Sequence, residues 1–127
     1  MSDQLPGRTP GRAWHFYVDD MIGFAENVLT YTKGYDQNDF EKSRLNYDAT
    51  LRNLELIGEA ATHINQHVRE FAPRVPWRLI IATRNRLIHG YLGIDNDTLW
   101  SIVCDNIPSL LTDLQALKNA ADADQVR

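Results

Sequence analysis

The chain has 127 residues, of which 43% are hydrophobic, and this length predicts one domain that can bury a core. Its net charge of -4 and its pI near 5.4 exclude a protein that coats nucleic acid through a broad basic surface. It has neither an apolar run long enough to span a bilayer nor a signal-like apolar segment near Met1, so we expect a soluble, cytoplasmic protein without a membrane partner.

Helical periodicity runs through most of the chain, and no segment shows the sustained alternation that is typical of a strand. We therefore expect an all-α fold, namely a four-helix up-down bundle with a short extra helix. The bundle should occupy residues 12–119. A flexible amino terminus is expected at 1–11 and a frayed tail at 120–127.

The first two long helices follow from apolar spacing and from their stop signals. The first is expected from about Ala13 to Lys33, with Gly34 as its stop, and a short helix is expected around residues 39–44. The second should run from about Asn46 to Phe71. The residues expected in the core are Phe16 or Tyr17, Met21, Ala25, Val28 or Leu29, and then Leu54, Ile57, Ala61, Ile64 and Val68.

Gly58 lies in the middle of the second predicted helix. Glycine costs about 1 kcal/mol relative to alanine in a helix interior. Its presence therefore indicates that another backbone approaches closely there.

The third helix should begin at Pro76 and end near Gly90, and the fourth should begin near Asn96 or Asp97. Pro108 lacks a backbone donor, so it predicts a kink in the fourth helix. A lone Cys104 excludes an internal disulfide, and we expect it to pack in the core. The expected core residues are Trp77, Ile80, Ile81, Leu87, Ile88, Trp100, Val103, Ile107, Leu110, Leu114 and Leu117.

The segment 83–91, Thr-Arg-Asn-Arg-Leu-Ile-His-Gly-Tyr, carries side chains suited to phosphate chemistry. The guanidinium of Arg84 can orient phosphate oxygens, and the imidazole of His89 can move a proton near neutral pH. Asn85 follows the arginine, and Tyr91 lies two residues after the histidine. This long spacing is expected by chance only about 10⁻³ times in such a chain.

Residues five apart on a regular helix differ by about 140 degrees, so Arg84 and His89 do not share a face. Three arrangements remain open. The helix can unwind at Gly90, or a two-fold interface along the third helix can gather both residues from two chains into one cleft. Alternatively, Arg84 is a structural residue paired with a carboxylate such as Glu59.

Other polar and aromatic residues permit simpler interpretations. Glu59, His63 and His67 share a helical stripe and could ligate a metal, but a fourth ligand is not evident, so we expect a solvated stripe and no cofactor. Six of the ten arginines lie between residues 52 and 86, either as a basic cleft or as solvated side chains. The three tryptophans are expected to anchor the core or an interface rather than to stack on bases.

The motif resembles the signature of the HEPN superfamily of ribonucleases, and within it that of the HepT-like toxins, Arg-x4-His-x-Tyr with a polar residue after the arginine. The resemblance covers about residues 12–118. It includes the segments 53–60 and 76–78 before the motif, and Gly93-Ile94-Asp95 with Trp100 after it. Gly90 departs from the family pattern, which more often has an acidic residue at that position.

This resemblance implies a homodimeric, metal-independent endoribonuclease toxin that acts on RNA, most typically tRNA. Arg84 and His89 would be catalytic, and Asn85 and Arg86 would position the phosphate. A cognate minimal nucleotidyltransferase antitoxin would inactivate the protein by adding AMP to Tyr91. The alternative is a non-catalytic helical subunit that presents substrate to a nucleotidyltransferase, and the intact motif disfavours it.

Overall fold

The computed structural model describes residues 13–89 and 94–126, and all regular structure within these ranges is helical. The all-α class is thus confirmed. The elements are, in chain order, α1 (Trp14–Thr32), α2 (Gln37–Lys42), α3 (Arg44–Ala61), α4 (Gln66–Phe71), α5 (Trp77–His89), α6 (Asn96–Ser101), the π-helical turn η1 (Ile102–Asn106) and α7 (Ile107–Asp122).

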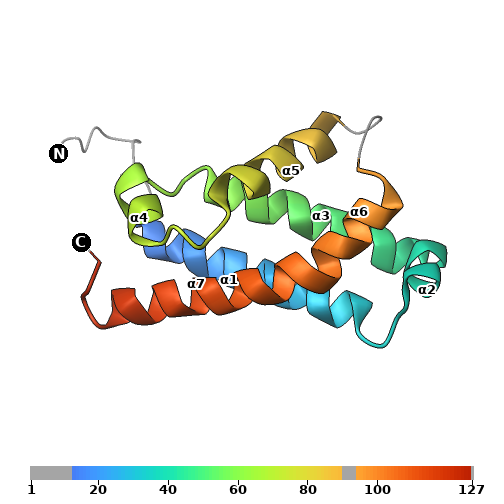
Figure 1. The fold of residues 1–127 in the computed structure, drawn as a ribbon, viewed down its shortest axis with the longest axis horizontal. Helices are drawn as coiled ribbons and strands as arrows, with labels where there is room; N and C mark the ends of the chain where they lie inside the picture. The colour runs from blue at the N-terminus through green and yellow to red at the C-terminus, as the bar shows by residue number, and fades with distance from the viewer. Residues whose placement is uncertain (1–12, 90–93, 127) are drawn as a thin grey trace, which may run out of the picture.

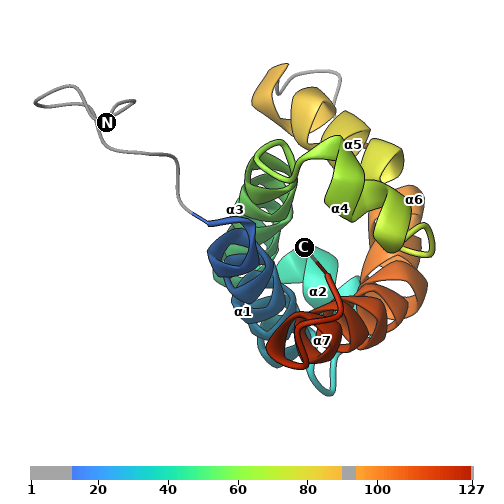
Figure 2. The ribbon, with the colours of Figure 1, turned by 90° about the vertical axis from the view of Figure 1, so that its left-hand side faces the viewer.

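The helix α1 packs against both α3 and α7, and α5 packs chiefly against α3 (Figure 1). In the end-on view of Figure 2, α1, α3, α5 and the α6–α7 segment surround the core. That core is almost wholly aliphatic. Its fully buried side chains include Val18, Met21, Ala25, Val28, Phe40, Leu99 and Leu114.

The predicted stop at Gly34 is present, and the short helix expected around residues 39–44 lies slightly earlier, at Gln37–Lys42. Gly34 has a φ of +78°, a left-handed conformation that glycine adopts without a steric penalty, and it lies just after α1 ends. The next helix, α2, is then started by a capping box in which the Asp36 side chain accepts from the Asp39 backbone N–H at 2.8 Å. Of the two residues proposed for the first core position, Tyr17 is half-buried and Phe16 is exposed.

The continuous helix expected at 46–71 is wrong, because the chain breaks it into α3 and α4. Asn65 is in extended backbone and its side chain caps α4 by accepting from the Val68 N–H at 2.9 Å. The Arg69 guanidinium donates to the Ile64 carbonyl at 2.9 Å and to the Ala61 carbonyl at 3.1 Å, and the Ala61 carbonyl also accepts from the Ile64 N–H at 3.1 Å. Ile64 and Val68 remain buried, so the apolar pattern survives across the turn.

The last long segment changes direction between α6 and α7, as Figure 1 shows. The distortion predicted from Pro108 takes the form of η1, where the Ile107 N–H bonds to the Ile102 carbonyl in a π-type step. Pro108 lies in the first turn of α7, where its missing donor is tolerated. Asp95 caps α6 through the Thr98 N–H at 2.9 Å, and this bond lowers the pKa of its carboxyl.

Two expected core residues are instead on the surface. Cys104 is exposed, because the buried stripe passes through the neighbouring Val103 and Ile107, although partial desolvation still raises the pKa of its thiol. Ile88 is 48% exposed near the end of α5, where the neighbouring Leu87 packs against the core instead.

The carboxyl-terminal segment, expected to fray from residue 120, continues α7 to Asp122 and places Val126 among the buried side chains. Within the described residues, no helix combines the length and apolar character needed to cross a bilayer.

Candidate active site

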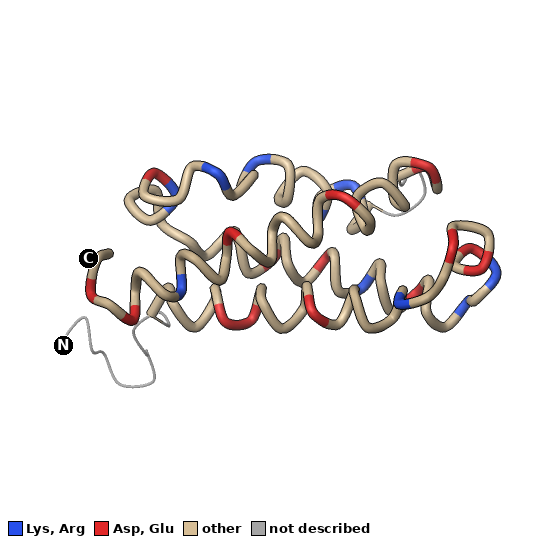
Figure 3. The backbone as a smooth tube through the Cα atoms, turned by 60° about the horizontal axis from the view of Figure 1, so that its bottom comes forward, with Lys and Arg blue, Asp and Glu red and all other residues tan. Residues whose placement is uncertain are grey.

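Among the described helices, α5 is the one with a net positive charge. It carries Arg78, Arg84 and Arg86 and no acidic residue, whereas acidic side chains are spread over the other elements (Figure 3). The start of α5 is anchored by Trp77, whose buried indole N–H donates to the Ala72 carbonyl at 3.0 Å. A surface with this charge attracts anions, a phosphate backbone among them.

Gly58 is the point where α5 crosses α3. A Cβ placed on Gly58 would collide with the Cβ of Arg84 and would lie 2.9 Å from both the Arg84 Cγ and the Ile80 carbonyl oxygen. The close backbone approach predicted from the sequence is thus confirmed. This crossing holds the Cβ of Arg84 against α3.

The guanidinium of Arg84 is held by two acceptors. One terminal nitrogen lies 2.5 Å from Glu59 Oε1, and the other donates to Asn85 Oδ1 at 2.8 Å. The Nε atom is buried and has no hydrogen-bond partner within the described part of the chain. The side chain remains 25% exposed, so it is paired but still accessible at the surface.

Of the arrangements that the sequence left open, the pair between Arg84 and Glu59 is present in the single chain. Glu59 is itself 48% exposed, which makes this a surface pair rather than a core pair. A pair of this kind contributes little to folding, typically below about 1 kcal/mol. The contact therefore matters more for the charge and orientation of Arg84 than for the stability of the fold.

His89 is exposed and lies at the last residue of α5. Because α5 is α-helical through His89, about 140 degrees still separate it from Arg84 within the described chain. Gly90, where unwinding was proposed, lies outside the described residues. One chain therefore does not bring Arg84 and His89 onto the same face.

Asn85 connects the two positions. It lies four residues before His89 and seven after Arg78, so these three residues share the exposed face of α5. Its side-chain oxygen also accepts from Arg84, which draws the guanidinium toward that face. Arg86 is exposed as well, and Tyr91 lies outside the described residues.

The expected stripe of Glu59, His63 and His67 is divided by the break between α3 and α4. His63 Nε2 lies 3.6 Å from Glu59 Oε2, while His67 belongs to α4. Among residues 13–89 and 94–126, no three His, Cys, Asp or Glu side chains are grouped so as to hold a metal ion. The acidic group of the stripe instead bridges His63 and Arg84.

A stacking contact between Tyr17 and His63 was not anticipated. Their rings are 4.5 Å apart and 9° from parallel, and they join the start of α1 to the turn that follows α3. The two residues are 46 positions apart in the sequence, and neither belongs to a recognisable motif. No sequence signal could have paired them.

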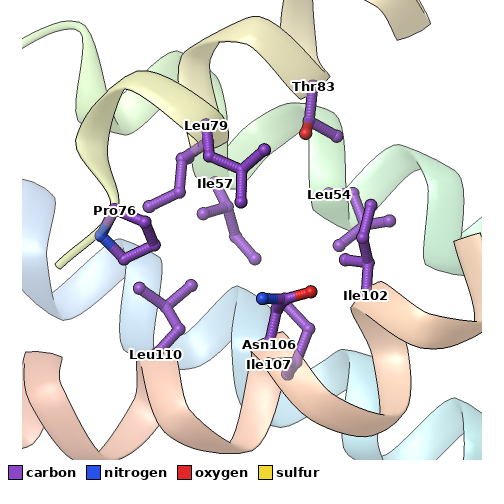
Figure 4. A pocket seen from close by; sticks show the side chains of 10 residues that line it. Leu54, Ile57, Pro76, Leu79, Thr83, Ile102, Asn106, Ile107 and Leu110 are labelled. Carbon is purple, nitrogen blue, oxygen red and sulfur yellow. The ribbon is translucent and has the colours of Figure 1, made fainter. Parts of the chain in front are cut away.

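Behind α5 lies an apolar pocket between α3, α5 and the η1–α7 segment (Figure 4). No charged side chain lines it, so it offers nothing to a phosphate group. The labelled side chains of Figure 4 point toward one another from these elements, namely Leu54, Ile57, Pro76, Leu79, Thr83, Ile102, Asn106, Ile107 and Leu110.

Comparisons with known proteins agree with the motif. Residues 21–117 match the family model described as "Ribonuclease HepT-like". "Putative RNase MJ1380" of Methanocaldococcus jannaschii is 38% identical over 99 residues, which cover 78% of this chain and 91% of that protein. "Probable ribonuclease HepT" of Thermococcus cleftensis is 33% identical over 102 residues, which cover 80% of this chain and 93% of that protein. No solved structure matches the chain significantly.

Proposed function

Because the chain belongs to the HepT-like ribonuclease family, we propose that it is a metal-independent endoribonuclease and the toxin of a toxin–antitoxin pair. The observation that carries this proposal is the placement of Arg84, Asn85 and His89 on the one helix of the described chain that is rich in arginine and free of acidic residues. RNA is the substrate, and tRNA is the substrate class that we favour.

The chemistry is an internal transesterification. The 2'-hydroxyl of the ribose loses its proton and attacks the adjacent phosphorus, and the bond to the leaving 5'-oxygen breaks as that oxygen gains a proton. The products are a 2',3'-cyclic phosphate and a 5'-hydroxyl. His89 moves one of these protons, and Arg84 stabilises the negative charge that develops on the non-bridging oxygens.

Asn85 and Arg86 position the phosphate for this step. Asn85 already accepts from Arg84 and lies one helical turn before His89, so it can align the guanidinium with the imidazole. Arg86 is exposed and unopposed by acid on its own helix, which suits a contact to a neighbouring phosphate. Glu59 holds one end of Arg84 and leaves other N–H groups of the guanidinium for the substrate.

The working site is formed by two copies of the chain. The separation of Arg84 and His89 around α5 is resolved when two α5 helices face each other across a two-fold axis, because each arginine then meets the partner's histidine. Ile88 supports this arrangement, since it is 48% exposed and lies four residues after Arg84. It would supply an apolar contact at the edge of the cleft.

Regulation is proposed to act on Tyr91. A cognate minimal nucleotidyltransferase would transfer AMP from ATP to its phenol oxygen with release of pyrophosphate, placing a negative phosphate close in sequence to His89 and opposing RNA by charge and by bulk. Intact mass spectrometry after co-expression with that enzyme should show one or more added AMP units on the wild type and none on Tyr91→Phe. Equal modification of the Phe variant would mean that Tyr91 is not the target.

The catalytic proposal is tested by RNA cleavage in the presence of EDTA. We expect the wild type to remain active, because protons and a guanidinium replace a metal in the mechanism. Arg84→Ala and His89→Ala should each reduce cleavage by about 10² or more, the usual size of these catalytic contributions. Unfolding by denaturant, followed in parallel, should leave both variants folded.

Two results would contradict this function. Activity that disappears with EDTA and returns with a divalent ion would require a metal mechanism. Wild-type protein that binds RNA but never cuts it would favour the alternative of a substrate-presenting subunit of a nucleotidyltransferase.

A further inference from the structure

The stacked pair of Tyr17 and His63 presents an aromatic surface close to Arg84. Tyr17 covers one face of the imidazole at a ring distance of 4.5 Å, yet 47% of the His63 side chain is exposed. The exposed area must therefore lie on the opposite face and the edge of the ring. Tyr17 is half-buried and packs against the core, so its ring holds the His63 ring in a fixed position.

His63 is connected to Arg84 through a single carboxylate. Its Nε2 atom lies 3.6 Å from Glu59 Oε2, and the other carboxylate oxygen lies 2.5 Å from the Arg84 guanidinium. The ring and the guanidinium thus flank one side chain on the same surface of the molecule. A nucleotide whose phosphate contacts Arg84 can bring its own base, or that of its neighbour, to the ring.

We propose that the open face of His63 is a subsite that stacks an unpaired nucleobase of the RNA beside the phosphate held by Arg84. This inference rests on the proposed function and adds a substrate class, namely RNA that is single-stranded at the cut. Aromatic rings stack on every base with little sequence preference. A base can reach the ring only if it is unpaired, as in loops, bulges and single-stranded ends.

The surrounding charge favours RNA over a protein as the occupant. Between residues 66 and 89, on α4, α5 and their connection, there are five arginines and one acidic residue, Glu70. This arrangement attracts a phosphate backbone toward the ring. Glu59 opposes this attraction in part, and its contact with Arg84 offsets some of its negative charge.

Fluorescence of a base analogue tests the stacking directly. The probe is an RNA octamer of uridine with one 2-aminopurine ribonucleotide, moved through successive positions, because 2-aminopurine is quenched when it stacks. The protein carries His89→Ala to prevent cleavage. We expect quenching at one or two positions, and an octamer that is abasic at those positions should bind about fivefold or more weakly.

Variants at His63 separate stacking from an effect transmitted through Glu59. His63→Leu removes the planar ring, so it should abolish the quenching and weaken RNA binding about fivefold or more. His63→Phe keeps a planar ring but cannot form an ion pair with Glu59. It should retain the quenching and the wild-type affinity for RNA. His67→Leu is the matched control, since His67 is also an exposed histidine but lies on α4. It should leave the quenching unchanged.

Each other result would overturn the inference. Unchanged quenching in His63→Leu would place the base elsewhere, and equal losses in His63→Leu and His63→Phe would assign His63 a role through Glu59. A change in the mass of the particle measured by light scattering for His63→Leu would assign this surface to a second copy of the chain. The proposed ribonuclease function survives all three results as long as the wild-type protein cleaves RNA. A wild-type protein that binds no RNA would refute both the ribonuclease function and the stacking subsite.

Discussion

Glu59 sets how much positive charge Arg84 can offer to RNA. The two side chains lie 2.5 Å apart, but both are partly exposed, so their attraction is weakened by solvent. The pair therefore stabilises the fold only slightly, while it neutralises a guanidinium that the proposed mechanism uses. Its functional effect should exceed its structural effect.

Glu59→Gln tests this separation. We expect RNA to bind about three- to tenfold more tightly at low salt, because a negative charge near the phosphate is removed, and we expect the gain to shrink as salt screens the interaction. The free energy of unfolding should change by less than about 1 kcal/mol. Fluorescence titrations with labelled RNA at several salt concentrations, and denaturant unfolding, measure the two effects.

A second α3 glutamate provides the control. Glu55 pairs with Arg52 at 3.2 Å and has no contact with Arg84, so Glu55→Gln should not tighten binding to the same degree. Weaker binding by Glu59→Gln, together with a large loss of stability, would instead make the pair a structural element.

The sequence named these residues as candidates but did not give their contacts. The motif gave Arg84, Asn85 and His89 as candidates, and helical periodicity showed that the first and last do not share a face. The partner of Arg84 stayed open, because Glu59 is 25 residues away and nothing local links the two. Only the crossing of α3 and α5 selects that pair.

At the level of elements, the crossing of α3 and α5 determines where the Arg84 side chain lies. Gly58 lets α5 approach so closely that the Arg84 Cβ occupies the space where a side chain of Gly58 would be. The two groups that a Gly58 side chain would meet, the Arg84 Cβ and the Ile80 carbonyl, cannot move without moving the α5 backbone. Any larger residue must therefore separate the two helices.

Gly58→Ala should destabilise the protein by about 1–3 kcal/mol, since the forced separation outweighs the gain of about 1 kcal/mol in helix propensity. Cleavage should fall as well, because Arg84 moves with α5. Gly23→Ala is the matched control. Gly23 lies within α1 and a Cβ there meets nothing within 4 Å, so that variant should be neutral or more stable. Denaturant unfolding compares them, and stabilisation of both variants would refute the close crossing.

Helix identity followed from apolar spacing, but helix boundaries depended on side-chain hydrogen bonds. The break between α3 and α4 was missed because Ile64 and Val68 continue the apolar spacing of a helix across it. The side chains of Asn65 and Arg69 form hydrogen bonds with the backbone groups at the break. The distortion before Pro108 was predicted from its missing donor. Its form as a π-helical turn was not, because a missing donor at Pro108 does not by itself select the step in which the Ile107 N–H bonds to the Ile102 carbonyl.

Across the whole molecule, charge is segregated although the chain is acidic overall. Five of the ten arginines lie on α4, α5 and the connection between them, where Glu70 is the one acidic residue, and most of the other acidic residues lie on the remaining described elements (Figure 3). This asymmetry gives RNA one favourable face. It also limits how two copies can meet, because two arginine-rich helices that face each other repel unless a phosphate backbone or the pair between Arg84 and Glu59 offsets their charge.

A composite site makes a prediction that no single-chain site shares. If each site combines Arg84 of one copy with His89 of the other, mixing the inactive Arg84→Ala and His89→Ala variants creates heterodimers in which one site has both intact residues. Random reassociation should then restore about a quarter of wild-type cleavage, because half of the dimers are mixed and half of their sites are complete. Unfolding and refolding the variants together allows the exchange, and light scattering should report particles of twice 14.6 kDa. Each variant refolded alone should remain inactive, and a mixture with no more activity than the separate variants would place Arg84 and His89 of one chain in the same site.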